Sequence, residues 1–213
     1  MIEQNIKEAL DLLNTHYETF HMAEHFATKT DHPVPTDTRA WSQVLASILT
    51  GVNGLKREKG ADLKDGSDVK AAITWEAIDT PRFNGVIKAG TKSKTAGKLE
   101  SLDNVPHLFL VLWDNSPETK NHRCRVWCVC PQTDKLFREM CSKWYDDKNS
   151  GKIVSSNFQL HPPRNLNSNI IKNTYGTFEY PLYFCAERIN GEYQVIIYDE
   201  NVLHNGTCKN ISK

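Results

Sequence analysis

The chain has 213 residues, with 26 Lys+Arg against 26 Asp+Glu, so its formal net charge is zero. This length suffices for a buried core and predicts one domain. Zero net charge excludes a strongly basic molecule, so a nucleic-acid partner would have to be held by a local patch, or by two patches in a symmetric dimer. No apolar run approaches a membrane span, and the first residues show no signal-peptide pattern. We therefore expect a cytoplasmic protein of a prokaryotic cell whose six cysteines are reduced.

Two helices are expected at the beginning of the chain. Apolar residues recur at three- and four-residue steps over 2–27, which is the period of an amphipathic helix. A second helix is predicted over 38–52, with Thr36 or Asp37 as its cap and Gly51 at its end.

The stretch 60–72 carries the most specific pattern in the chain. Asp65-Gly66 is a strong turn signal between two short runs, and a three-residue loop there predicts a β-hairpin. Side chains alternate along a strand, so this register collects charged residues on one face. The residues that would share this face are Asp62, Lys64, Asp68 and Lys70. A two-residue loop would shift the register and separate them.

Two carboxylates and a lysine on one face suit metal-assisted hydrolysis of a phosphodiester. Carboxylate oxygens are hard ligands for Mg²⁺, which also binds substrate phosphate and acidifies a bound water. A lysine beside them can position that water and stabilise the charge that develops on the phosphate. The alternative is an exposed polar hairpin, because charged residues often simply face water.

Basic residues flank this stretch on both sides. Those before it are Lys56, Arg57 and Lys59, and those after it are Arg82, Lys88, Lys92, Lys94 and Lys98. The segment 85–98 is polar and has no acidic residue, so it could contact a phosphate backbone and become ordered on DNA. A solvated surface loop has the same composition, and both alternatives stay open.

Further strands and another helix are expected towards the C-terminus. The predicted strands cover residues 105–114, 123–130, 180–189 and 192–198. The last two would form a hairpin around Asn190-Gly191, a type I′ turn signal. Between the two strand pairs, Thr133 or Asp134 caps a helix that continues to about residue 147.

The segment 155–169 gathers amide, histidine and arginine side chains around two prolines. Asn and Gln pair with adenine, and Arg with guanine, at major-groove edges, so we expect DNA contacts here. The residues assigned to this interface are Asn157, Gln159, His161, Arg164 and Asn165. Alternation over 157–161 would place Phe158 and Leu160 in the core and the polar side chains outside. A connecting loop whose amides bond its own backbone is the alternative.

Asp68-Val69-Lys70 matches the (D/E)-X-K half of a nuclease motif, with Asp62 as the upstream aspartate. By these residues and the order of its elements, the chain resembles a type II restriction endonuclease of the PD-(D/E)XK nuclease superfamily over roughly 38–185. Two features depart from the family pattern. Ala61 stands where proline is usual, and only five residues separate the two aspartates.

The resemblance implies an α/β fold, with a PD-(D/E)XK-like mixed β-sheet flanked by helices in a single nuclease domain over 1–213. It implies a Mg²⁺-dependent homodimer that cuts both strands of a specific double-stranded DNA site. Asp62, Asp68 and Lys70 would be catalytic, and the two aspartates would hold the metal. Asp65 or an upstream glutamate, Glu18 or Glu24, stays an alternative partner in the metal site.

Two other functions would use parts of the same sequence. A structure-specific or repair nuclease would share the acidic site without base readout. A non-catalytic DNA-binding module would keep the basic segment but have no use for the aspartates and lysine.

Overall fold

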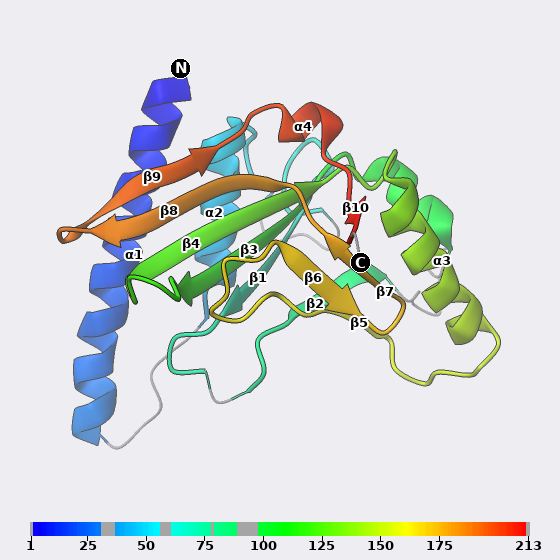
Figure 1. Cartoon of the computed structure of the whole chain (residues 1–213), viewed down its shortest axis with the longest axis horizontal. Helices are drawn as coiled ribbons and strands as arrows, with labels where there is room; N and C mark the ends of the chain where they lie inside the picture. The colour runs from blue at the N-terminus through cyan, green and yellow to red at the C-terminus, as the bar shows by residue number, and fades with distance from the viewer. Residues whose placement is uncertain (1, 31–36, 56–60, 78, 89–97, 212–213) are drawn as a thin grey trace.

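A five-stranded mixed sheet forms the centre of the molecule, which we describe from a computed structural model (Figure 1). The structure describes residues 2–30, 37–55, 61–77, 79–88 and 98–211. The strand order is β1-β3-β4-β8-β9. These strands are β1 (Asp68–Ile73), β3 (Leu108–Asn115), β4 (His122–Val129), β8 (Leu182–Ile189) and β9 (Glu192–Tyr198). β1 runs parallel to β3, and every other neighbouring pair is antiparallel.

Two helices cover one face of this sheet. α1 (Ile2–Thr30) and α2 (Arg39–Thr50) pack against each other, while α1 also contacts β9 and α2 contacts β1. Phe109, Val111 and Trp113 of β3 share a core cluster with these helices. The intervening residues of β3 are buried on the opposite face, so the strand is enclosed on both sides, as its apolar run predicts.

One helix and two small sheets cover the other face. α3 (Lys135–Asn149) packs there. One small sheet pairs β2 (Phe83–Lys88) with β5 (Asn157–Leu160). The other contains β10 (Lys209–Asn210), β7 (Gly176–Glu179) and β6 (Ile170–Asn173), in that order. The 3₁₀-helix η1 (Leu99–Asn104) and the short helix α4 (Val202–Asn205) complete the described elements.

Most predicted elements are confirmed. The N-terminal helices, the buried strands, α3 and the closing hairpin lie where expected, and the mixed sheet is flanked by helices. Gly51 ends α2 in the left-handed conformation, and Asp134 accepts a hydrogen bond from the Phe137 amide as the cap of α3. Asn190 and Gly191 both have positive φ, as a type I′ turn requires. All six cysteines are buried and free.

The predicted hairpin at 60–72 is wrong. The residues before Asp68 form a tight turn, in which the amides of Asp62 and Leu63 both donate to the Ser67 carbonyl. β1 instead pairs in parallel with β3, and Lys70 lies opposite Leu110. This pairing is favoured because it packs Val69 into one core cluster and Ala72 into the other, whereas an isolated two-stranded hairpin is only marginally stable.

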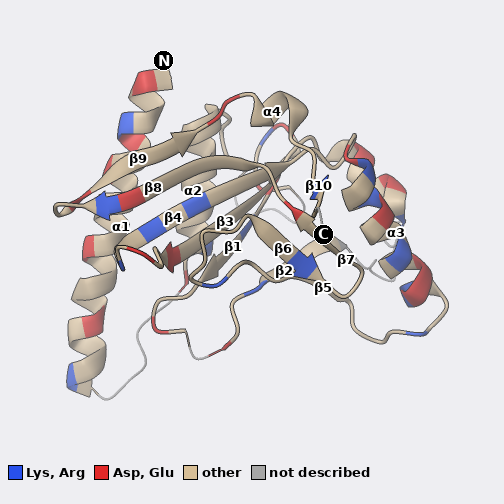
Figure 2. Cartoon of the chain, viewed as in Figure 1, with Lys and Arg blue, Asp and Glu red and all other residues tan. Residues whose placement is uncertain are grey.

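The two long outer helices differ in their charged residues. Figure 2 shows mainly acidic residues along α1, with basic residues near its two ends, and both signs interleaved along α3. Within the part of the chain that the structure describes, no helix is both long and apolar enough to cross a membrane.

Candidate active site

The edge strand β1 brings together three residues singled out in the sequence. Asp68 is its first residue and Lys70 lies two positions on, so both side chains leave the same face. Lys70 Nζ lies 2.7 Å from Asp68 Oδ1 and 2.6 Å from Asp68 Oδ2. Asp62 approaches from the preceding turn, and the Val69 amide donates to both Asp62 Oδ2, at 2.9 Å, and Asp68 Oδ1, at 3.1 Å. The three residues therefore form one cluster, although the register that predicted it is wrong.

The turn before β1 depends on a glycine and on Asp65. Gly66 has a φ of +99°, and a Cβ there would lie 2.7 Å from the Asn104 carbonyl oxygen, so glycine is required. The Asp65 carboxylate accepts hydrogen bonds of 2.9 Å from both the amide and the hydroxyl of Ser67. His107 Nδ1 contacts the same hydroxyl at 3.2 Å. Asp65, the alternative metal ligand, thus holds the turn together.

Sequence reasoning missed one member of the cluster, Gln43 of α2. Its Nε2 donates a hydrogen bond of 2.6 Å to Asp62 Oδ1. The other oxygen of Asp62 accepts from the Val69 amide at 2.9 Å. Both carboxylate oxygens are therefore oriented. A polar residue on a predicted helix does not reveal which strand it will meet, so no sequence signal pointed to Gln43.

The two glutamates of α1 that were alternative metal ligands, Glu18 and Glu24, do not contact the aspartates in the described structure. Glu24 Oε2 lies 2.8 Å from His21 Nδ1, and Glu18 is exposed. Lys64, expected on the same face as Asp68, is exposed as well, and among the described residues no hydrogen bond or ion pair joins its side chain to the cluster. The early-helix partner of the aspartates is thus an amide from α2.

Burial governs the protonation of Asp68 in this cluster. It raises the pKa of Asp68 from 3.8 to about 6, whereas Lys70 lowers that pKa and Asp62 raises it. Apolar side chains around Asp68 explain this desolvation. Asp68 lines a cavity of about 190 Å³ together with Val86, Ile87 and Leu102. A neighbouring pair of carboxylates is a place where a cation can bind instead of a proton.

The donor set fits a small divalent cation. Mg²⁺ is commonly bound through one or two carboxylates and keeps several waters, so the oxygens of Asp62 and Asp68 suffice. Among the described residues, no group of three or more His, Cys, Asp or Glu side chains could hold a metal.

An open groove of about 420 Å³ runs along β1 beside this cluster. Its floor is β1 from Val69 to Ile73, and Lys70 lines it. Thr38 and Arg39 at the start of α2 form one wall. Asn84 and Gly85 of β2 form the other. A ligand in this groove would therefore lie against the candidate catalytic lysine.

Comparison with known proteins identifies the family. The sequence model of the MamI restriction endonuclease family matches residues 25–194, which is most of the chain. The chain belongs to the MamI restriction endonuclease family. The type II restriction enzyme MamI of Microbacterium ammoniaphilum is 31% identical over 171 residues, which cover 75% of this chain and 54% of that protein. The chain thus spans about half the length of this curated relative. No solved structure matches.

The matched region of this MamI-family chain includes the whole Asp62–Asp68–Lys70 cluster and α2. It also includes the β2–β5 wall of the groove. Some predicted DNA contacts cannot be placed, because Lys56, Arg57, Lys59, Lys92 and Lys94 lie outside the described residues. Lys88 ends β2, and Lys98 is exposed just before η1.

The predicted alternation along β5 is confirmed. Phe158 and Leu160 are buried, while Asn157 is exposed and Gln159 is half-buried. Beyond β5, Arg164 and Asn165 are exposed in a turn.

The later amides of the segment bond the protein itself. Asn167 Oδ1 accepts from Arg123 at 2.7 Å, and Asn169 Oδ1 accepts from Trp127 Nε1 at 3.0 Å. Asn167 and Asn169 therefore join this segment to side chains of β4 and do not bond the loop's own backbone as the alternative expected.

Positive charge gathers around His161. Burial lowers the pKa of this histidine, and so do the neighbouring cations Arg82 and Lys172. Arg82 is half-buried and lies 3.8 Å from Asp79. Lys172 belongs to β6, the strand with the basic band in Figure 2, and sequence reasoning missed it.

Proposed function

We propose that this protein is a Mg²⁺-dependent type II restriction endonuclease, which hydrolyses phosphodiester bonds at a specific site in double-stranded DNA. The observation that carries this proposal is the cluster of Asp62, Asp68 and Lys70, whose lysine lines an open groove. The family supports it, because the relative MamI is named a type II restriction enzyme.

Each residue of the cluster has a separate task in this proposal. Asp62 and Asp68 would hold Mg²⁺, which when bound acidifies a water and neutralises charge on the phosphate. Gln43 and the Val69 amide orient the Asp62 carboxylate. Lys70, held by Asp68 at the groove, would stabilise the negative charge on the scissile phosphate.

The fold is consistent with the PD-(D/E)XK type, which we propose for the whole chain as one nuclease domain. The Asp-x-Lys pair lies on an edge strand of a mixed sheet, and a helix from earlier in the chain supplies a polar group to the same site. Cutting both strands requires two such sites, so we propose a homodimer. A dimer also suits the zero net charge, because each subunit would contribute one basic patch.

DNA would lie along the groove in this proposal. Arg39 lines the groove, and Arg82 and Lys172 cluster around His161 beyond the β2 wall, where they could contact phosphates. The proposed base contacts come from the polar side of β5 and the turn after it. These residues are Asn157, Gln159, His161, Arg164 and Asn165.

Cleavage of phage DNA tests the proposal. The purified protein with Mg²⁺ should give discrete fragments on a gel. Asp68→Ala removes a metal ligand and should lower the cleavage rate by about 10³-fold, the scale of losing a key electrostatic group, while DNA binding in Ca²⁺ persists. Asp11→Ala, which changes an exposed carboxylate of α1, should cleave normally.

Other outcomes would contradict the proposal in distinct ways. Normal cleavage by Asp68→Ala would exclude this site. A smear of fragments would indicate a structure-specific or nonspecific nuclease. Intact DNA at every metal concentration, together with DNA binding, would favour a non-catalytic binding module.

A further inference from the structure

The β2–β5 ribbon has one apolar and one amide-bearing face. Phe83, Phe158 and Leu160 are buried in the core. The opposite face carries the side-chain amides of Asn84, Asn157 and Gln159. A two-stranded ribbon has the width to enter the major groove of DNA.

This ribbon is adjacent to the candidate active site. Asn84 lines the same groove as Lys70. A duplex whose backbone reached Lys70 would therefore lie against the amides as well.

A bulge in β2 positions the amides. Asn84 pairs with Gln159, but the next pair joins Lys88 to Asn157, so β2 has extra residues between them. Gly85 lies in this bulge with a φ of +61°, and a Cβ there would meet nothing within 4 Å. The Gly85 amide donates a hydrogen bond of 2.7 Å to Asn157 Oδ1. The bulge thus faces open space while it holds Asn157.

The Gly85 amide determines the direction of all three side-chain amides. A backbone N–H can only donate, so the Asn157 oxygen must face it and Asn157 Nδ2 must face away. Asn157 Nδ2 and Gln159 Nε2 both donate to Asn84 Oδ1, at 3.1 Å and 2.9 Å. Asn84 Nδ2 and Gln159 Oε1 are then left as a donor and an acceptor, and neither has a hydrogen-bond partner among the described residues.

We propose that this donor–acceptor pair reads an adenine of the DNA site, an inference that rests on the proposed function. Adenine presents the N7 acceptor beside the N6 amino donor at its major-groove edge. Asn84 Nδ2 donates to N7, and Gln159 Oε1 accepts from N6. Guanine presents acceptors at both positions, so Gln159 Oε1 would meet the guanine O6 with no hydrogen between them.

Base analogues test the two contacts separately. The preferred site is identified by sequencing the fragment ends, or by selecting bound duplexes from a random library in Ca²⁺. Each adenine of that site is then replaced by 7-deazaadenine, which lacks the N7 acceptor, or by purine, which lacks the amino group. At one adenine, each replacement should weaken binding and kcat/KM by about 10- to 100-fold, the scale of losing a base contact.

The variant Asn84→Asp exchanges the free donor for an acceptor. On the normal site, the binding affinity and kcat/KM of this variant should fall to the values of the wild-type protein on the 7-deazaadenine duplex. Replacing the adenine by 7-deazaadenine should then lower neither quantity further for the variant. Asn205→Asp introduces the same charge at an exposed asparagine of α4 and should keep the wild-type response to both analogues.

Two results would overturn the inference without affecting the catalytic proposal. One is that no adenine analogue matters in any duplex. The other is that Asn84→Asp responds to 7-deazaadenine as strongly as wild type. A third result would separate the two proposals. If the protein binds adenine-containing duplexes selectively in Ca²⁺ but does not cut them in Mg²⁺, the adenine contact is supported and only the catalytic proposal is contradicted.

Discussion

Gln43 orients an acidic residue of the candidate site although it lies on a different element. The hydrogen bond of 2.6 Å from Gln43 Nε2 restrains one oxygen of Asp62, and the Val69 amide restrains the other. Groups that orient a metal ligand typically change metal affinity or activity by about 10- to 100-fold when removed. We therefore treat Gln43 as a positioning residue for Asp62.

Gln43→Ala should lower the cleavage rate and shift the Mg²⁺ dependence to higher concentration, each by about 10-fold or more. The reason is that one Asp62 oxygen loses its donor while the carboxylate itself remains. Cleavage rates over a Mg²⁺ titration measure both effects. Val44→Ala changes the next residue of α2, whose side chain is 48% exposed, and should leave both unchanged. An unaltered Mg²⁺ dependence in Gln43→Ala would contradict the positioning role.

Asp134 connects α3 to the residue just before the C-terminal strand β10. Its Oδ1 caps α3 through the Phe137 amide at 3.0 Å, and its Oδ2 accepts from the Cys208 amide at 2.6 Å. The residue is only 1% exposed, so water cannot replace either bond when the side chain is removed. The cap predicted from local sequence thus has a second, long-range partner.

Asp134→Ala should destabilise the protein by about 2–4 kcal/mol, because a helix cap and a second buried hydrogen bond to a charged group are both lost. Urea unfolding followed by circular dichroism measures this change. Asp37→Ala removes an exposed carboxylate that accepts a bond from the Arg39 amide, and should cost less than about 1 kcal/mol. Equal destabilisation by the two substitutions would show that the Cys208 contact contributes nothing.

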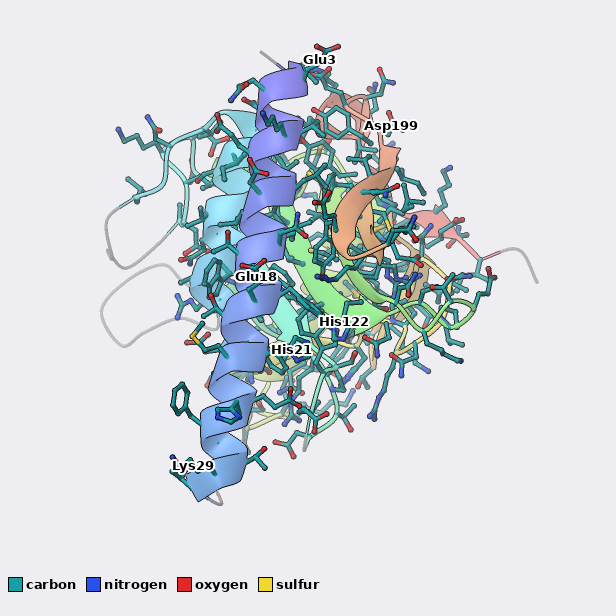
Figure 3. The ribbon with its side chains drawn as sticks, turned by 90° about the vertical axis from the view of Figure 1, so that its left-hand side faces the viewer. Glu3, Glu18, His21, Lys29, His122 and Asp199 are labelled. Atoms are coloured by element: carbon teal, nitrogen blue, oxygen red, sulfur yellow. The ribbon has the colours of Figure 1, made fainter. Side chains whose placement is uncertain are left out.

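At the scale of the whole molecule, one buried and one half-buried histidine join α1 to the sheet. His16 of α1 and His122 of β4 pack around Trp75, with ring centroids 5.6 Å and 4.3 Å from the indole. His21 of α1 lies beside His122, as Figure 3 shows. Burial lowers the pKa of His16 from 6.5 to about 4, and that of His122 likewise to about 4. The contact between α1 and the sheet therefore favours neutral imidazoles at His16 and His122.

The free energy of unfolding should decrease as the pH falls from about 6.5 to about 4. In this window the unfolded chain binds protons that the folded histidines exclude, so acid favours unfolding. Asp68 acts in the opposite direction, because its raised pKa makes the folded state bind a proton first. The two histidines lower the free energy of unfolding in acid and the single carboxyl group raises it, so the sum predicts a net loss of stability.

Urea unfolding of His16→Phe at several pH values tests this linkage. An aromatic side chain without a titrating nitrogen preserves packing beside Trp75, so the variant should lose less stability between pH 6.5 and 4 than wild type. His25→Phe alters an exposed histidine of the same helix and should keep the wild-type slope. Identical slopes for His16→Phe and wild type would contradict the prediction.

The sequence by itself determined the features whose signals act over a few residues. Gly51, Asp134 and the Asn190-Gly191 turn were predicted correctly because left-handed backbone and capping bonds depend on immediate neighbours. Strict alternation likewise separated the amides of β5 from its buried residues. The proximity of Asp62, Asp68 and Lys70 followed from their closeness in the chain.

The tertiary structure alone decided which distant segments meet. β1 pairs with β3 and not with its neighbour in the chain, because that pairing packs Val69 into one core cluster and Ala72 into the other. The same packing brings Gln43 to Asp62 and places Asn84 on the wall of the groove that Lys70 lines. These contacts join residues far apart in sequence, and their energy comes from burial of whole elements, so no local pattern encodes them.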